Sequence, residues 1–262
     1  MIVGNIPVDP LWWQKLFDEM YLITDARSVC NEEITRREVD FLEAHLQIDP
    51  AHSILDLCGG HGRHSLELAR RGCRRTTVLD YSGCLVRLGS TKAAEQGLPV
   101  RFVRADARRT GLAAGRFDLV LVMANSFGYF PDDRDNLQIL CEAHRVSRPG
   151  AVLLLDLLDS GYVVDQFQPA SVHHATEDIT VRRERELADN MIRVRETVVS
   201  RERGLLREGT YCERLYKEDE IVRLLGQAGF DRVRVLKDFS SHANPDDYGF
   251  MTQRVIVTAV KA

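Results

Sequence analysis

The chain has 262 residues, of which 44% are hydrophobic and 28% are charged, and its formal net charge at pH 7 is −4. This length suits one large domain or a core domain with an inserted subdomain. A weakly acidic chain exerts no long-range attraction on nucleic acid or anionic lipid, and no apolar run reaches the roughly 18 residues of a membrane-spanning helix. We therefore expect neither a nucleic-acid nor a membrane partner.

The cysteines are scattered along the chain without CxxC spacing. The opening residues also lack the charged-then-apolar arrangement of a secretory signal. Together these features predict free thiols in a reducing, cytoplasmic setting.

Residues 1–48 are predicted to form an N-terminal helical lid. The stretch "LWWQKLFDEMYL" (11–22) is rich in aromatic side chains and is expected to be helical. Residues 31–46 repeat apolar side chains at helical spacing, with Asn31 as the N-cap.

Short apolar strands alternate with helical stretches between residues 53 and 158. We expect strands at 53–57, 75–80, 100–106, 117–125 and 151–158, and helices at 63–71, 83–96 and 133–147. This alternation predicts an α/β fold with a doubly wound, mostly parallel, Rossmann-like sheet. Continuous apolar runs such as "DLVLVM" indicate strands that are buried on both faces.

The pattern changes after residue 160. Residues 171–215 alternate apolar and charged side chains, which is typical of an antiparallel sheet with one solvated face. A helix at 217–229 and strands at 231–239 and 253–262 follow, and the two strands are expected to complete a seven-stranded main sheet as a hairpin. The predicted organisation is a cofactor-binding domain (49–160 and 214–262) with an antiparallel β cap that binds substrate (161–213).

The bend after the first strand reads "CGGHGRHS". A P-loop needs a lysine, and no lysine occurs between residues 54 and 72, which excludes triphosphate binding of that kind. A dinucleotide fingerprint needs a third glycine or alanine where Ser65 stands, so NAD fits poorly. A ligand with adenosine but no phosphates fits this bend better.

Aspartates follow the first three strands at similar separations, namely Asp56, Asp80 and Asp106. Parallel strands end at one edge of their sheet, so these side chains are expected to lie close together. Asp80 is placed to accept both ribose hydroxyls, although a carboxylate there also suits NAD. Asp106 and the N–H of Ala107 are expected to meet the adenine, with Tyr81 against its face.

The stretches "LDLCGGHGRHSLELARRG", "VLDYS", "ADAR", "FDLVLVMANSFGYF" and "ERLYKEDEIVRLLGQAGF" resemble the successive motifs of class I S-adenosylmethionine-dependent methyltransferases. They are most similar to the small-molecule branch, whose members carry a D-L-x-C-G-x-G-R-H-S bend and an N-S-F-G-Y-F stretch. The resemblance covers residues 21 to the C-terminus and implies S-adenosylmethionine as the cofactor.

The resemblance also implies roles for single residues. Gly60 and Gly62 would form the bend under the cofactor, and the backbone at Met123 would meet its amino acid part. Tyr21 would reach the cofactor's carboxylate, and either Arg36 or Arg37 would share that contact. Cys58 replaces the first glycine of the usual DxGxGxG motif, so it would approach the ligand through its backbone.

The substrate side is predicted around "NSFGYF" (125–130). Asn125 and Tyr129 offer polar groups for catalysis, while Phe127 and Phe130 offer apolar walls. Trp13, in the lid, is expected to contact the substrate, with packing on the sheet as the alternative. His173 is the predicted base, and His242 is a second candidate. We expect no metal site, although His61 and His64 lie close together in the sequence.

These observations predict methyl transfer to a small molecule, most simply to an amine nitrogen of a secondary metabolite such as an antibiotic precursor. Transfer from a sulfonium is an in-line displacement that needs no metal. Oxygen or carbon acceptors, an RNA or protein substrate, and a non-catalytic cofactor-binding regulator are the alternatives. An unbroken arginine stripe across residues 69–75 and 104–109 would favour RNA. The oligomeric state stays open, a homo-oligomer included.

Overall fold

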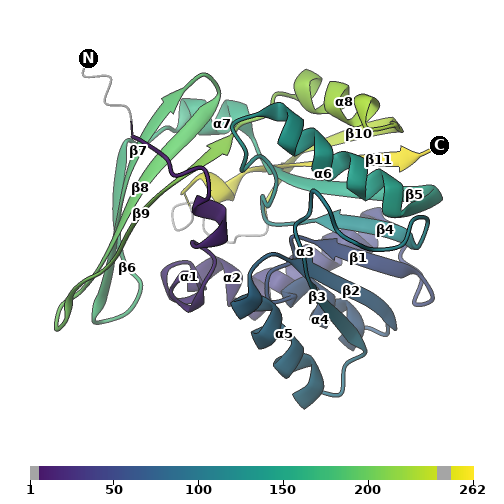
Figure 1. Cartoon of the computed structure of the whole chain (residues 1–262), viewed down its shortest axis with the longest axis horizontal. Helices are drawn as coiled ribbons and strands as arrows, with labels where there is room; N and C mark the ends of the chain where they lie inside the picture. Colours follow the sequence, from purple (N-terminus) through teal and green to yellow (C-terminus); the bar gives the residue numbers. More distant parts are fainter. Residues whose placement is uncertain (1–5, 241–248) are drawn as a thin grey trace.

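The computed structural model describes residues 6–240 and 249–262, which form two sheets with helices around them (Figure 1). The strands are β1 (Ser53–Leu57), β2 (Arg75–Asp80), β3 (Val100–Arg104), β4 (Phe117–Val122), β5 (Ser147–Leu158), β6 (Ala170–His174), β7 (Ile179–Ala188), β8 (Met191–Ser200), β9 (Gly204–Arg214), β10 (Phe230–Phe239) and β11 (Arg254–Lys261). The helices are η1 (Trp12–Gln14), α1 (Glu19–Thr24), α2 (Ala26–Val29), α3 (Glu32–His45), α4 (Arg63–Arg70), α5 (Gly83–Glu95), α6 (Asp133–Val146), α7 (Ser160–Asp165), α8 (Glu218–Gln227) and η3 (Gly249–Thr252).

The main sheet has seven strands in the order β10-β11-β5-β4-β1-β2-β3. Strands β1 to β5 run parallel, and β11 is antiparallel to both β5 and β10. The predicted α/β fold and its terminal hairpin are therefore confirmed. Both faces of the sheet are covered, since α6 and α8 pack on one apolar face and α3 and α4 on the other.

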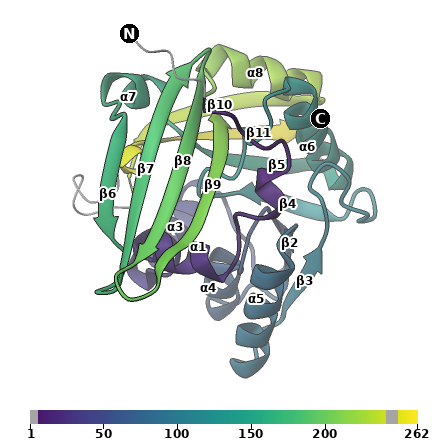
Figure 2. The same ribbon diagram turned by 60° about the vertical axis from the view of Figure 1, so that its left-hand side comes forward.

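The second sheet has four antiparallel strands in the order β6-β7-β8-β9, which confirms the predicted antiparallel segment. It stands beside the main sheet, and the N-terminal segment lies between the two (Figures 1 and 2). Arg183 of this sheet forms an ion pair of 2.8 Å with Asp25, and Arg207 forms one of 2.9 Å with Asp18. The N-terminal segment is thus fastened to the antiparallel sheet, a contact that the sequence did not predict.

The N-terminal segment differs from the predicted helix over 11–22. A 3-10 turn, η1, ends at Gln14, and helix α1 starts only at Glu19, because the Asp18 side chain caps it by accepting a hydrogen bond from the N–H of Tyr21. The predicted N-cap of the next long helix is confirmed, since the Asn31 side chain accepts from the N–H groups of Glu33 and Ile34. A capping side chain in the middle of an apolar run starts a new helix there.

Two general features complete the description. Every cysteine of the chain is a free thiol in the structure. Within residues 6–240 and 249–262, no helix is long and apolar enough to cross a membrane.

Candidate active site

Two cavities adjoin at the carboxyl edge of the main sheet. The large cavity has a volume of about 580 Å³ and lies between the N-terminal helices, the chain after β4 and the antiparallel sheet. The small cavity, of about 80 Å³, lies at the glycine bend after β1. The residues that line both cavities are Phe17, Tyr21, Val29, Arg63, Ala124 and Tyr129. A ligand in one cavity would therefore touch the same wall as a ligand in the other.

The glycine bend forms the floor of the small cavity. Cys58, Gly60 and Gly62 all have left-handed backbone, with φ of 60°, 57° and 74°. A Cβ on Gly62 would lie 2.7 Å from the Phe102 ring, so this position needs glycine. A Cβ on Gly60 would meet its nearest atom at 3.5 Å, so no such contact excludes one there.

The strand-end aspartates take different positions. Asp80 borders the small cavity and accepts hydrogen bonds of 2.8 Å from the N–H groups of Gly60 and Ser82. Burial raises the pKa of Asp80 to about 6. Asp56 is fully buried under the bend and accepts from the Ser65 hydroxyl at 2.8 Å, while its other oxygen has no hydrogen-bond partner among the described residues.

Asp106 lies outside the lining of both cavities. Its carboxylate pairs with Arg108, which the sequence did not single out, at 2.7 Å. The Arg108 guanidinium lies over the rings of Phe130, at 4.4 Å, and Trp13, at 5.1 Å. Trp13 in turn contacts Tyr81 with ring centroids 4.5 Å apart. The buried Ala107 belongs to the same apolar core cluster as these aromatic rings. The predicted adenine-binding residues are thus brought together, and a carboxylate with four lone-pair positions can accept further donors.

The turn after β4 carries the polar groups predicted for catalysis. Ala124 and Asn125, which follow the buried Met123, have left-handed backbone with φ of 53° and 57°. Asp156 holds this turn, since its carboxylate accepts from the N–H of Ala124 at 2.8 Å and its carbonyl accepts from the N–H of Asn125 at 2.9 Å. The amide oxygen of Asn125 is also used, because it accepts from the N–H of Leu158.

The aromatic residues that follow this turn lie at different depths. Tyr129 lines both cavities and stacks on Phe17 with ring centroids 5.6 Å apart. Burial raises the pKa of the Tyr129 phenol well above its ordinary value, so the hydroxyl keeps its proton. Phe127 is 1% exposed, packs on Tyr216 and lines neither cavity, so the structure does not bring it to the other predicted substrate residues.

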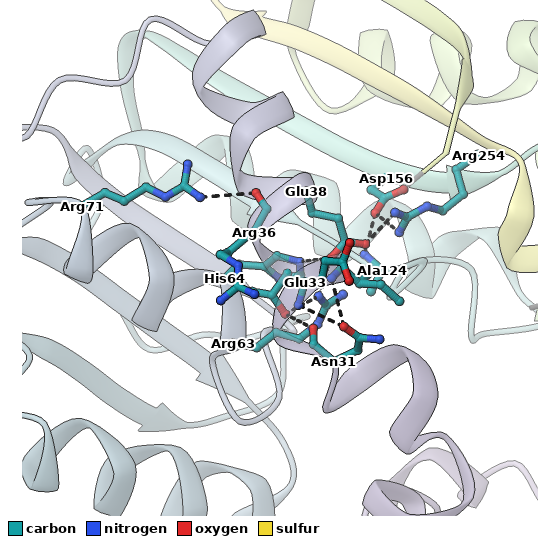
Figure 3. A network of polar contacts seen from close by, with 12 residues as sticks. Asn31, Glu33, Arg36, Glu38, Arg63, His64, Arg71, Ala124, Asp156 and Arg254 are labelled. Atoms are coloured by element: carbon teal, nitrogen blue, oxygen red, sulfur yellow. Dashed lines mark hydrogen bonds and ion pairs between the residues drawn. The ribbon is translucent and has the colours of Figure 1, made fainter. Parts of the chain in front are cut away.

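A buried ion-pair network fixes the bend and the turn to one another (Figure 3). The Glu38 carboxylate pairs with Arg63 of the bend, with His64 at 2.8 Å and with Arg254 of β11 at 2.5 Å. Arg254 also pairs with Asp156 at 2.7 Å. Figure 3 shows that these side chains converge from α3, α4, β5 and β11, whereas Arg71 points away.

Arg63 is a residue that the sequence analysis missed. Arg63 lines both cavities. Arg36 and Arg37, one of which was predicted to bind the cofactor's carboxylate, line neither, because Arg36 is exposed, Arg37 is half-buried, and they pair along α3 with Glu32 and Glu33. The signal that could have found Arg63 is its place at the first helical position after Gly62.

His173 lines the large cavity, and its Nε2 lies 3.0 Å from the carbonyl oxygen of Thr24. A carbonyl can only accept, so Nε2 carries the proton and Nδ1 is left as the acceptor. Burial lowers the pKa of His173, which keeps the ring neutral at neutral pH. His242 lies outside the described residues. Within the part of the chain that the structure describes, no three His, Cys, Asp or Glu side chains cluster as metal ligands do.

Comparison with known proteins adds the family. A methyltransferase-domain family model matches residues 54–150. The glycine/sarcosine/dimethylglycine N-methyltransferase of Actinopolyspora halophila is 24% identical over 81% of this chain and 37% of its own length. The ubiquinone/menaquinone biosynthesis C-methyltransferase UbiE of Agrobacterium fabrum is 33% identical over 41% of each chain. Residues 54–150 are thus a methyltransferase domain. The chain spans less than half the length of these two relatives.

The methyltransferase also matches solved structures over its whole length. The sugar N-methyltransferase KedS8 from Streptoalloteichus superposes with a TM-score of 0.67 at 20% identity, covering 100% of this chain and 98% of that one. The likeness extends to the fold as a whole, antiparallel sheet included.

The methyl donor of the methyltransferase is S-adenosylmethionine, and the small cavity, of about 80 Å³, has room for only part of a ligand of that size. The small cavity is lined by the carboxylates of Asp56 and Asp80 and by the guanidinium of Arg63. The open oxygen of buried Asp56 is an acceptor that a sulfonium or an ammonium would satisfy, and Arg63 suits a carboxylate. The predicted cofactor is therefore confirmed.

Cys58 offers a test of the methyltransferase's bend. A left-handed residue with a Cβ costs about 1–2 kcal/mol, and glycine costs about 0.5–1 kcal/mol in lost chain freedom. These terms offset each other, so we expect the free energy of unfolding of Cys58→Gly to stay within about 1 kcal/mol of the wild type. Cys58→Val should lower it further, because a β-branched residue disfavours this backbone. Urea unfolding of both variants checks this, and equal stabilities would contradict the strain argument.

Proposed function

We propose that this enzyme methylates an amine nitrogen of a small molecule bound in the large cavity, as a tailoring step on a secondary metabolite. The observation that carries the proposal is the wall shared by the two cavities, which lets an acceptor in the large one meet a methyl donor in the small one. A volume of about 580 Å³ is in the range of small-molecule pockets. The similarity to a glycine/sarcosine/dimethylglycine N-methyltransferase and to a sugar N-methyltransferase supports nitrogen as the acceptor atom.

The surface arginines support a small acceptor rather than RNA. Arg71 pairs with Asp40, Glu43 and Glu67, and Arg108 with Asp106 and Asp135. Carboxylates thus interrupt the arginine stripe that phosphate binding would use.

For the cofactor, we propose that Asp80 accepts the ribose hydroxyls, that Asp106 and Ala107 meet the adenine beside Tyr81, and that the bend and Met123 hold the methionine part. Tyr21 and Arg63 are proposed to bind its carboxylate, since both line the small cavity. Burial raises the pKa of Tyr21, so its phenol remains a donor.

For the acceptor, we propose that Asn125, Tyr129 and His173 supply the polar contacts from opposite sides of the large cavity. Trp13 and Phe130 support the adenine side through Arg108, and Phe127 supports the turn after β4 from below. The N-terminal segment (1–48) and the antiparallel sheet (161–213) together serve as the cover of the acceptor.

The main task of the enzyme in methyl transfer is to position the acceptor against the methyl donor. S-adenosylmethionine supplies a methyl group that is already activated by its sulfonium. Holding the acceptor about 3 Å from that carbon, in line with the breaking bond, is worth about 7–11 kcal/mol. We propose that the wall shared by the two cavities provides that alignment.

An acceptor screen tests the proposal. The purified enzyme is given S-adenosylmethionine and a panel of amino acids, amino sugars, phenols and quinols, and S-adenosylhomocysteine release is measured together with the mass of each product. We expect turnover with amines and a methyl group on nitrogen. Methylation confined to phenol oxygens or quinol carbons would overturn the assignment to nitrogen, the latter favouring the C-methyltransferase relatives.

A further inference from the structure

Glu213 lies on the wall of the large cavity at the end of β9. It pairs in register with Ile192 of β8, and Tyr211, two residues earlier on the same strand, lines the same cavity. Alternate residues of a strand share a face. Glu213 therefore projects from the face of the antiparallel sheet that covers the cavity, and not from its solvated face.

Among the side chains that the structure describes, the Glu213 carboxylate has no hydrogen-bond or ion-pair partner, and burial is the sole cause of its raised pKa. The other carboxylates on this wall are all neutralised by arginine. Asp25 and Glu196 pair with Arg183, Glu196 also pairs with Arg207, and Glu38 pairs with Arg63. A half-buried carboxylate without a partner is costly to keep charged, and a cation that arrives with a ligand would offset that cost.

The pKa of Glu213 is consistent with a carboxyl group that has no cationic partner. Burial raises the pKa of Glu213 to about 8, and no neighbouring cation opposes it. Its charge in turn contributes to the raised pKa of Tyr129, after burial and the charge of Tyr21. The titratable and charged groups that line the cavity with it are Tyr21, Asp25, Arg27, Glu38, Arg63, Tyr129, Tyr162, His173, Arg183, Arg185, Glu196, Tyr211 and Cys212. Glu213 is thus coupled electrostatically to Tyr129, one of the residues that line both cavities.

We propose that Glu213 binds the protonated amino group of the acceptor and takes its proton for methyl transfer. This inference rests on the proposed function and narrows it to basic, aliphatic primary or secondary amines. Because its pKa is raised to about 8, Glu213 is largely protonated in the free enzyme at neutral pH, and this proton leaves to water when the ammonium group binds and stabilises the carboxylate. The ammonium then passes its own proton to Glu213, and the freed lone pair on nitrogen forms the bond to the methyl carbon. The carbon–sulfur bond breaks and its electron pair stays on sulfur, giving S-adenosylhomocysteine. Glu213 then releases the proton to water.

The first test needs no acceptor. A carboxyl group whose pKa is raised in the native state binds a proton that the unfolded chain has released, so stability falls as pH rises from about 4.3 to about 8. The Glu213→Gln variant has no carboxyl group at this position, so its stability does not fall over this pH range for this reason. We expect its melting temperature to exceed that of the wild type at about pH 9 and to match it at about pH 5. If the variant and the wild type have equal melting temperatures at both pH values, Glu213 already has a partner in the protein and the proposal is wrong.

The second test uses the amine found in the acceptor screen. For Glu213→Gln we expect kcat/KM to fall by roughly 10²–10⁴-fold at neutral pH, as for loss of a general base. The activity should recover as pH rises toward the pKa of the amine, because the neutral amine no longer needs the carboxylate. S-adenosylmethionine affinity should not change. Glu208→Gln, on the same strand but exposed, is the matched control.

The outcomes separate the two proposals. An amine methylated equally fast by Glu213→Gln and wild type overturns the role of Glu213 and leaves N-methylation intact. A screen that yields only oxygen or carbon acceptors overturns N-methylation itself. A loss in Glu213→Gln that does not recover at high pH, or one that Glu208→Gln shares, overturns proton transfer and binding by Glu213.

Discussion

Asp80→Ala is expected to weaken S-adenosylmethionine binding at least about tenfold, since a hydrogen bond to a charged group contributes about 1.5–3 kcal/mol. The carboxylate stands at the end of β2, borders the small cavity and also accepts from the N–H of Gly60. Its loss would therefore remove both the proposed ribose acceptor and a contact that holds the bend.

Isothermal titration calorimetry measures this effect. Asp118→Asn is the matched control, because Asp118 also accepts a backbone N–H, that of Ser53 at 2.8 Å, and pairs with Arg148, but lies near the start of β4 at the opposite edge of the sheet. Its S-adenosylmethionine affinity should equal that of the wild type. Unchanged affinity in Asp80→Ala would contradict the ribose assignment.

Glu38→Ala is expected to lower the free energy of unfolding by about 3–5 kcal/mol, as removal of one partner from a buried ion pair does. Glu38 is 1% exposed and is held by Arg63, His64 and Arg254. Its removal leaves two guanidinium groups buried with fewer acceptors. The lowered pKa of Glu38, which burial opposes and Arg63 and Arg254 bring about, shows that the carboxylate is charged in the native state.

Urea unfolding measures the free energy of unfolding of Glu38→Ala and of a control variant. Glu33→Ala is the control on the same helix, since Glu33 is exposed and pairs only at the surface with Arg37. A surface pair contributes at most about 1 kcal/mol. Similar losses in the two variants would show that the network contributes no more to stability than a surface pair.

The main sheet could be predicted from the sequence because its signals are local. Strands β1 and β2 lie where the apolar runs at 53–57 and 75–80 predict them, and the side chain of Asn31 caps the helix that it was predicted to start. Local patterns fail where one side chain changes the outcome. Asp18 interrupts an aromatic run that otherwise reads as one helix.

The site was predicted less completely because its contacts join distant parts of the chain. Glu38 and Arg254 are 216 residues apart, and no spacing rule relates them. Arg108, adjacent to the predicted Ala107, was overlooked because arginines two residues from an aspartate are common on solvated surfaces. Glu213 was overlooked because charged residues alternate along β9, and a sequence does not show which face of that strand is covered.

The ion pair between Arg254 and Asp156 has a consequence for the order in which the chain folds. Asp156 holds the left-handed turn at Ala124, and its own charge is balanced from the last strand, β11. We therefore expect the turn at Ala124 to reach its native shape only after β11 has joined the sheet. A chain truncated before Arg254 would keep every residue proposed to touch the ligands, and we expect its turn at Ala124 to be less well held.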